Sequence, residues 1–224
     1  MSLILNIDTA TETASICLAE NGRPISLVQN ENQQDHASWL HTAIEQMMQQ
    51  ANYEMKDLHA VAVGAGPGSY TGLRVGMAAA KGFCYALDIP LITENTLFIM
   101  AFAASQQIQT KNSLLCPMID ARRMEVFTAL YATSLQEMIP PTAMILDAGS
   151  FAEELSYSFI TFFGSGNKKW QQVTKNSNAL FSEIKADAGH LSILSHRKFT
   201  EKKFTDIRYC EPLYLKAFYT NINK

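Results

Sequence analysis

Short apolar runs open the chain and predict three strands. Residues 3–8 and 15–20 are mostly apolar, which is typical of buried strands. The dipeptide Asn21-Gly22 is a strong hairpin signal, and it joins the second run to a third strand at 25–29. The first thirty residues are therefore predicted to form a meander of three strands.

Beyond the meander, the apolar positions take the period of a helix. Leu40, Ile44, Met47 and Ala51 recur at intervals of three and four residues, which predicts an amphipathic helix from about 35 to 52. The chain then continues with four further predicted elements, a strand at 59–63, a helix at 73–87, a strand at 90–93 and a helix at 96–105. This order is typical of a ribonuclease H-like α/β fold.

The second half of the chain begins in the same way. Residues 115–120 form an apolar run that ends in Ile119-Asp120, as residues 3–8 end in Ile7-Asp8, and each run is followed by a returning apolar segment. Two such halves predict an α/β protein of the actin/hexokinase-like (ASKHA) class, with a cleft between a domain at 1–106 and a smaller one at 107–224. The second domain is expected to be reduced, because Pro140-Pro141 interrupts it and only a strand at 160–163 and a short helix at 188–196 are evident.

A glycine-rich loop separates the predicted strand at 59–63 from the helix at 73–87. It has glycines at 64, 66, 68 and 72, but it lacks the lysine of a Walker A loop and the last glycine of a dinucleotide fingerprint. Two interpretations are equally supported. The glycines let the helix pack closely on the sheet, or they bring backbone close to a phosphate or to another chain.

The turns after the two Ile-Asp strands are candidate phosphate loops, as in actin-like folds. Asp8, Thr9 and Asp120 are the candidate nucleotide contacts. Neither turn has a glycine that would let backbone N–H groups reach an anion, and the carboxylate of Glu12 would repel a phosphate. We therefore do not expect this chain alone to bind ATP tightly and hydrolyse it. Asp8 and Asp120 facing each other across the cleft would suit a magnesium or acid–base site, although aspartate at a strand end more often forms a turn.

The histidines, cysteines and serines do not form a catalytic or metal-binding pattern. His36 and His41 are five residues apart, which places them on different faces of a helix, so no metal is expected. Ser69 is not in a nucleophile elbow, and no catalytic residue is predicted. The four cysteines are far apart and suit buried, reduced thiols in a cytoplasmic protein.

Composition narrows the class of protein further. The chain has 224 residues and a net charge of −3. No apolar run is long enough to span a bilayer, and the first residues continue directly into a predicted strand, so neither a membrane span nor a signal peptide is expected. Residues 1–164 carry 7 basic and 16 acidic side chains, whereas 165–224 carry 11 and 5. The basic C-terminal part is interpreted as a solvated surface in preference to a phosphate-contacting patch.

The two helices of the first half have small and apolar residues that predict a partner-binding surface. Gly76 and Ala80 would let a second helix approach closely, and we expect a large charged residue at either position to abolish pairing while the fold survives. The predicted interface consists of Leu40, Ile44, Met47, Leu73, Gly76, Met77, Ala80 and Phe83.

Several motifs together resemble the TsaB (YeaZ) family. They are IDTAT at 7–11, GPGSYTGLRVG at 66–76, AKG at 80–82, IDAR at 119–122 with EVF at 125–127, and PLYLK at 212–216. The resemblance covers most of the chain in order, and the stretch 130–205 matches least. Ala10 stands where many relatives have serine, and Lys216 replaces a closing arginine.

The resemblance implies a non-catalytic scaffold subunit of the bacterial machinery that forms threonylcarbamoyladenosine beside the tRNA anticodon. It implies a heterodimer with TsaD, joined by TsaE, and contact with tRNA through the complex. A homodimer is expected when the chain is alone, because the predicted apolar face would otherwise be exposed. It implies no cofactor bound tightly by this chain, with ATP or ADP at the complex interface. The loop residues carried over to the interface are Gly66, Gly68, Ser69, Thr71, Gly72 and Arg74.

Two other functions remain open from the sequence. Asp8, Asp120 and the glycine loop would suit an actin-fold ATPase or carbamoyltransferase that acts in its own cleft. The basic C-terminal part would suit direct tRNA binding, which depends steeply on salt.

Overall fold

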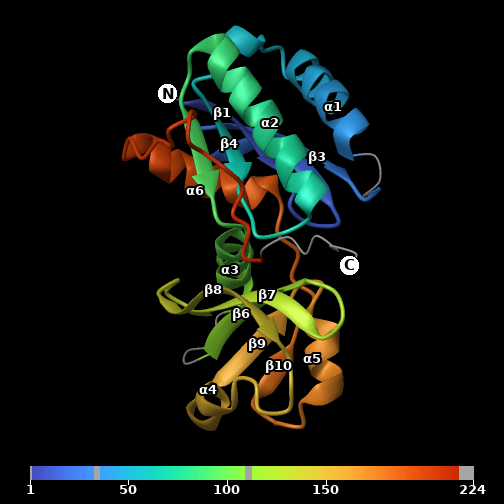
Figure 1. Ribbon diagram of the computed structural model, residues 1–224. Helices are drawn as coiled ribbons and strands as arrows, with labels where there is room; N and C mark the ends of the chain where they lie inside the picture. Colours follow the sequence, from blue (N-terminus) through green and yellow to red (C-terminus); the bar gives the residue numbers. More distant parts are fainter. Residues whose placement is uncertain (1, 33–35, 109–112, 217–224) are drawn as a thin grey trace, which may run out of the picture.

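The computed structural model describes residues 2–32, 36–108 and 113–216 as two halves, each built on a five-stranded sheet (Figure 1). The first sheet contains β1 (Leu3–Asp8), β2 (Ala14–Glu20), β3 (Arg23–Asn30), β4 (Ala60–Gly64) and β5 (Leu91–Glu94). The second sheet contains β6 (Ser113–Asp120), β7 (Glu125–Ala132), β8 (Glu137–Ile145), β9 (Phe159–Phe163) and β10 (Ala179–Phe181).

The two sheets have the same strand order. It is β3-β2-β1-β4-β5 in the first and β8-β7-β6-β9-β10 in the second. In each, three antiparallel strands are followed by two strands parallel to the central one, β1 or β6. The duplication inferred from the two Ile-Asp strands is confirmed, and the fold is actin/hexokinase-like, with two ribonuclease H-like halves.

The halves differ in their helices. In the first, α1 (His36–Gln50) and α2 (Tyr70–Leu87) cover one face of the sheet. The short 3-10 turn η2 (Met55–Asp57) lies between α1 and β4. In the second, α4 (Ala152–Tyr157) and α5 (Asn167–Val173) have only 6 and 7 residues. The expected reduction of the second half is confirmed.

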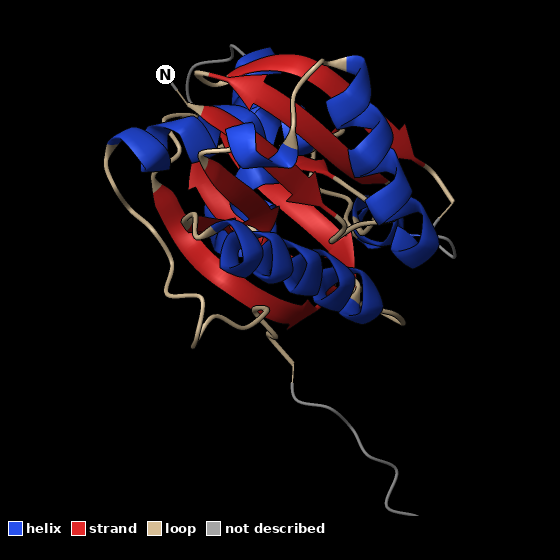
Figure 2. Cartoon of the chain, turned by 90° about the horizontal axis from the view of Figure 1, so that it is seen from above, coloured by secondary structure: helices blue, strands red, loops and turns tan. Residues whose placement is uncertain are grey.

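Two longer helices connect the halves. α3 (Thr96–Gln107) lies between the sheets, where Met100 and Ala104 pack against the second sheet and Ile99 and Phe102 against the first. α6 (Ala188–Thr200) follows β10 in the chain, yet it packs on the first sheet, opposite α1 and α2. Figure 2 shows helices on both sides of the strands. The predicted boundary at 106/107 falls at the end of α3, and α6, from the predicted second domain, completes the first half.

Buried polar groups fix α6 on the first sheet. The Ser195 hydroxyl donates to Asn6 Oδ1 at 2.6 Å, and the Ala188 N–H donates to Ser15 Oγ at 2.8 Å. Asn6 and Ser195 are fully buried. Each would be costly to bury without the other, so these contacts specify where α6 lies.

The expected interruption at Pro140-Pro141 is wrong. Both prolines lie within β8, which is an edge strand that pairs only with β7. An edge strand tolerates proline because its outer N–H groups have no partner strand. α4, α5 and β10 were not predicted, and α2 begins at Tyr70 instead of 73. A bilayer-spanning helix would need more length and apolar character than any helix among the described residues has.

Candidate functional site

The glycine loop packs against the chain's own first turn. A Cβ at Gly68 would lie 2.1 Å from the Ala10 carbonyl oxygen, and one at Gly72 would lie 2.0 Å from that of Thr9. The Ser69 N–H donates to the Ala10 carbonyl at 2.7 Å. Backbone cannot yield as a flexible side chain can, so only glycine fits. Of the two interpretations of the loop, this geometry supports close internal packing.

The same loop begins α2 and ties it to α3. Ser69 is the N-cap of α2 and its hydroxyl accepts from the Gly72 N–H at 3.3 Å. Gly66 exchanges two hydrogen bonds with Thr96 in the first turn of α3, one to the hydroxyl at 3.1 Å and one from the backbone N–H at 2.8 Å. Thr71 and Arg74, the other two residues carried over by motif, are exposed on α2.

The PLYLK motif at 212–216 lies across this loop. The Leu213 N–H donates to the Ala65 carbonyl at 2.7 Å, and Arg74 Nε donates to the Tyr214 hydroxyl at 3.2 Å. The Arg74 guanidinium also lies 4.2 Å from the ring centre of Tyr70. Lys216 pairs with Glu125 on β7. Two motifs 140 residues apart thus form one structure that joins α2 to the second half.

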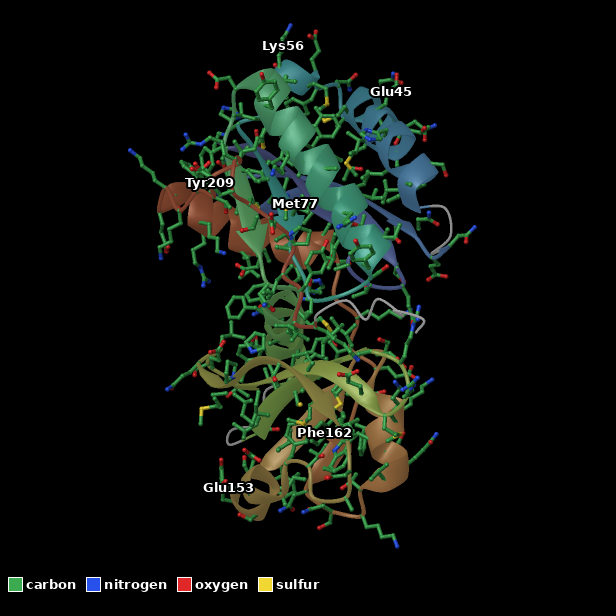
Figure 3. All side chains as sticks on the ribbon, viewed as in Figure 1. Glu45, Lys56, Met77, Glu153, Phe162 and Tyr209 are labelled. Atoms are coloured by element: carbon green, nitrogen blue, oxygen red, sulfur yellow. The ribbon has the colours of Figure 1, made fainter. Side chains whose placement is uncertain are left out.

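The predicted interface residues are mostly core residues, and this prediction is corrected. Leu40, Ile44, Met47, Leu73, Met77 and Ala80 are each at most 4% exposed, and Gly76 is buried as well. Only Phe83 is partly exposed. The cluster between α1, α2 and the first sheet contains Leu40, Ile44, Met47, Met77 and Ala80, and Phe83 packs against it; Figure 3 labels Met77 on α2. A helical apolar stripe has the same period whether it faces a sheet or a partner.

The expected effect of a charge at Gly76 is also corrected. A Cβ there would lie 2.4 Å from Thr9 Oγ1, so a large charged residue would disrupt the fold itself. The exposed residues of α2 are different ones, which include Arg74, Ala78, Gly82 and Tyr85. A Cβ at Gly82 would have no neighbour within 4 Å.

A cavity of about 280 Å³ lies between the two halves, with Asp8 in its wall. Asp8 is 3% exposed, and burial raises the pKa of its carboxyl from 3.8 to about 6. A hydrogen bond from the Ala10 N–H opposes the shift, and the charge of Asp187 adds to it. The second half contributes Gly164, Lys168 and other residues to the opposite wall.

The other two candidate nucleotide contacts do not line this cavity. Thr9 is fully buried, and its hydroxyl donates to the Gly72 carbonyl at 2.7 Å, so no ligand can reach it. Asp120 is exposed and pairs with Lys169 at 2.8 Å. Burial alone would raise the pKa of Asp120, but the bond from Lys169 holds it below its ordinary value. The suggested pairing of Asp8 and Asp120 in one site is therefore wrong.

The structure adds detail on metal-binding and nucleophilic groups. Within 2–32, 36–108 and 113–216, no group of three or more His, Cys, Asp or Glu side chains is placed to hold a metal ion. His41 on α1 instead makes an edge-on ring contact with Phe83. Cys17, Cys84 and Cys116 are buried free thiols, and burial raises the pKa of Cys116 to about 12, far from the thiolate form.

Two side chains of the basic run at 196–203, His196 and Lys198, make contacts with the first half, whereas Arg197, Lys202 and Lys203 are exposed. Lys198 pairs with Glu94 at 2.9 Å and donates to the Thr93 carbonyl at 2.8 Å. His196 contacts the Ser2 hydroxyl at 2.9 Å. These two side chains attach α6 to the first half. Only the remaining basic side chains of the run are exposed charges.

Comparison with known proteins places the chain in a family. A family model described as "TsaD: tRNA N6-adenosine threonylcarbamoyltransferase" matches residues 27–206. The chain belongs to this family, and within it to the TsaB (YeaZ) proteins. The TsaB proteins of Escherichia coli and Bacillus subtilis are each 28% identical to it over 95% of its length, which covers 94% and 93% of theirs. Both are named "tRNA threonylcarbamoyladenosine biosynthesis protein TsaB".

Two solved structures have the same fold as this chain. YeaZ from Pseudomonas aeruginosa superposes with a TM-score of 0.79 at 22% identity, and covers 96% of this chain and 100% of its own. A second P. aeruginosa structure, described as similar to peptidase YeaZ, has a TM-score of 0.83 at 23% identity over the same shares. At this identity the likeness is evidence for the fold alone.

Proposed function

We propose that this chain takes part in threonylcarbamoyladenosine formation on tRNA as a non-catalytic subunit that pairs with a TsaD-type catalytic protein. The observation that carries the proposal is the match, along nearly the whole chain, to two proteins named for this pathway. The wider assembly, with TsaE and with tRNA held through the complex, belongs to the same proposal, as does a cytoplasmic location.

The first turn supports a non-catalytic role. In actin-like folds, backbone N–H groups of this turn hold phosphate. Here the Ala10 N–H donates to Asp8 and the Ala10 carbonyl accepts from Ser69 in the glycine loop. The loop thus fills the space beside the turn with the chain's own backbone. Tight nucleotide binding by the chain alone is accordingly not part of the proposal, and ATP or ADP would bind where two subunits meet.

The exposed face of α2 is the surface proposed for pairing. Ala78 and Gly82 are exposed one helical turn apart, and Tyr85, 84% exposed, lies next to them along the helix. Small side chains allow the axes of two packed helices to come close, because this distance is set by the side chains at the contact. A helix of the TsaD-type partner would pack here, and a second copy of this chain would occupy the same face when the partner is absent.

The test is light scattering of the protein alone and mixed with the TsaD of the same organism. We expect a homodimer that converts to a heterodimer. Gly82→Arg should prevent the conversion while the circular dichroism spectrum stays unchanged, because a side chain at Gly82 enters open space. Gln171→Arg, which adds the same charge to the exposed face of α5, is the matched control and should pair normally.

A chain that stays indifferent to TsaD would overturn the pairing role. Sustained ATP hydrolysis by the chain alone that is lost in Asp8→Asn would replace it with the alternative of an actin-fold enzyme acting in its own cleft.

A further inference from the structure

The cavity between the halves has an acidic wall from the first half and a wall with two lysines and one glutamate, Glu183, from the second. The first half contributes Asp8, Glu12 and Glu31, and the second half contributes Lys168 and Lys185. Its volume of about 280 Å³ is near the lower limit for small-molecule sites, so it suits a small metabolite. Nothing proposed above for the pairing of this chain uses this cavity.

Asp8 is a buried carboxylate without a cation. One of its oxygens accepts a single hydrogen bond from the Ala10 N–H, at 3.1 Å. Among the described residues its other oxygen has no hydrogen-bond or ion-pair partner. A carboxylate that is 3% exposed is costly to bury in this way. A ligand ammonium group beside it would offset that cost.

Lys168 and Lys185, the two lysines of the opposite wall, differ from the nearby Lys169 in their ion pairing. Lys169 pairs with Asp120, whereas Lys168 and Lys185 are exposed and form no ion pair in the described part of the chain. They are flexible cations that can turn toward an anionic group inside the cavity.

The charge pattern argues against a phosphate ligand. A phosphate would lie close to the carboxylates of Asp8, Glu12 and Glu31, which repel an anion. Glu183 on the second-half wall adds to this repulsion. A ligand that carries only positive charge would in turn meet Lys168 and Lys185.

We propose that this cavity binds a small zwitterion of the amino-acid class. The ligand's ammonium group lies at Asp8 and its carboxylate faces Lys168 and Lys185. Its side chain contacts the apolar part of the wall, which includes Met100, Ile119 and Ile184. Because the two charged walls come from different halves, such a ligand joins them across the cleft.

The experiment is a screen of the twenty L-amino acids by thermal shift and calorimetry on the full chain. We expect at least one to bind in the millimolar range or tighter. Its analogues without the amino group or without the carboxylate (for alanine, propanoate and ethylamine) should each bind about tenfold more weakly or not at all, because each loses a charged hydrogen bond.

Variants locate the binding. Asp8→Asn, which keeps the shape of the side chain, and Lys168→Gln combined with Lys185→Gln should weaken binding about tenfold. Glu12→Gln is a second variant of the acidic wall that spares the core. Lys175→Gln, which removes an exposed lysine outside the cavity, is the matched control.

Two results would overturn the proposal. One is that none of the twenty amino acids binds at 10 mM. The other is that ATP or inorganic phosphate binds instead, and binds more tightly to Asp8→Asn. Loss of pairing with TsaD in solution is a separate readout, so failure of either proposal can be told from failure of the other.

Discussion

The two halves share a strand order but treat the turn after the central strand differently. After β1, Thr9 and Ala10 are buried, and the glycine loop packs directly against their carbonyl groups. After β6, the turn is exposed, and it places Arg122 and Arg123 in the left-handed region with φ of 71° and 48°. The duplicated sheets were preserved, whereas the turns that hold phosphate in actin-like folds became a packing site in one half and a charged surface in the other.

The helices extend this difference. α1 and α2 have 15 and 18 residues and bury a continuous apolar cluster on the first sheet, while α4 and α5 cover the second sheet with less than half that length. Aromatic side chains fill the second core instead, and the ring of Phe162 contacts those of Phe151 and Trp170. The first half therefore has long helical surfaces to offer a partner, and the second does not.

The largest effect is expected at the closed first turn. Gly72→Ala should destabilise the fold by several kcal/mol, because its Cβ would collide with the Thr9 backbone. Gly82→Ala on the same helix should stabilise it by about 0.5–1 kcal/mol, because alanine favours a helix and meets nothing. Urea unfolding of both variants measures the contrast. Equal effects would show that the loop does not pack on the turn as described.

The next effect compares Asp8 with Asp120. The pKa of Asp8 is about 6 in the fold and 3.8 as a free group, so the folded state binds the proton more tightly. The contribution of Asp8 to the free energy of unfolding is fully present below about pH 4 and is lost as the pH rises through 6. The total loss is roughly 3 kcal/mol. Asp8→Asn should therefore raise the unfolding free energy at pH 7.5 and leave it nearly unchanged at pH 4.

Asp120 provides the matched comparison because its pKa is shifted downward. Asp120→Asn should lower stability slightly at pH 7.5 and not at low pH, the opposite sign to Asp8→Asn. Denaturant midpoints at the two pH values measure both. If Asp8→Asn destabilised the protein at pH 7.5, its carboxylate would have a stabilising partner in the fold.

The smallest effect is expected at the contact that joins the halves. Lys216→Ala removes the ion pair with Glu125, and the lysine side chain is 41% exposed. Such a pair contributes about 1 kcal/mol or less, and less at high salt. Thermal unfolding at low and high salt measures it. A loss of several kcal/mol would mean that the PLYLK motif holds the two halves together.

Local patterns were enough for much of the fold. The strands at 3–8 and 115–120, the helical stripe of Leu40 and Ile44, and the hairpin at Asn21-Gly22 depend on contacts between near neighbours, so their period and turn residues identify them. The repeated Ile-Asp run was enough to infer the duplication. The family followed from motifs that survive as short strings.

Only the folded chain decides which surfaces and groups meet. The stripe on α1 and α2 faces the sheet, α6 crosses to the first half, and Asp8 lies in a cavity that Asp120 does not reach. Only glycine fits at positions 68 and 72, because the backbone of Ala10 and Thr9, more than fifty residues away in the sequence, lies against them. The spacing of apolar residues along the chain is a local property, whereas the surface that each residue contacts is set by packing between distant segments. This is why the pattern predicted the elements and their duplication, but not the position of the interface or of the cavity.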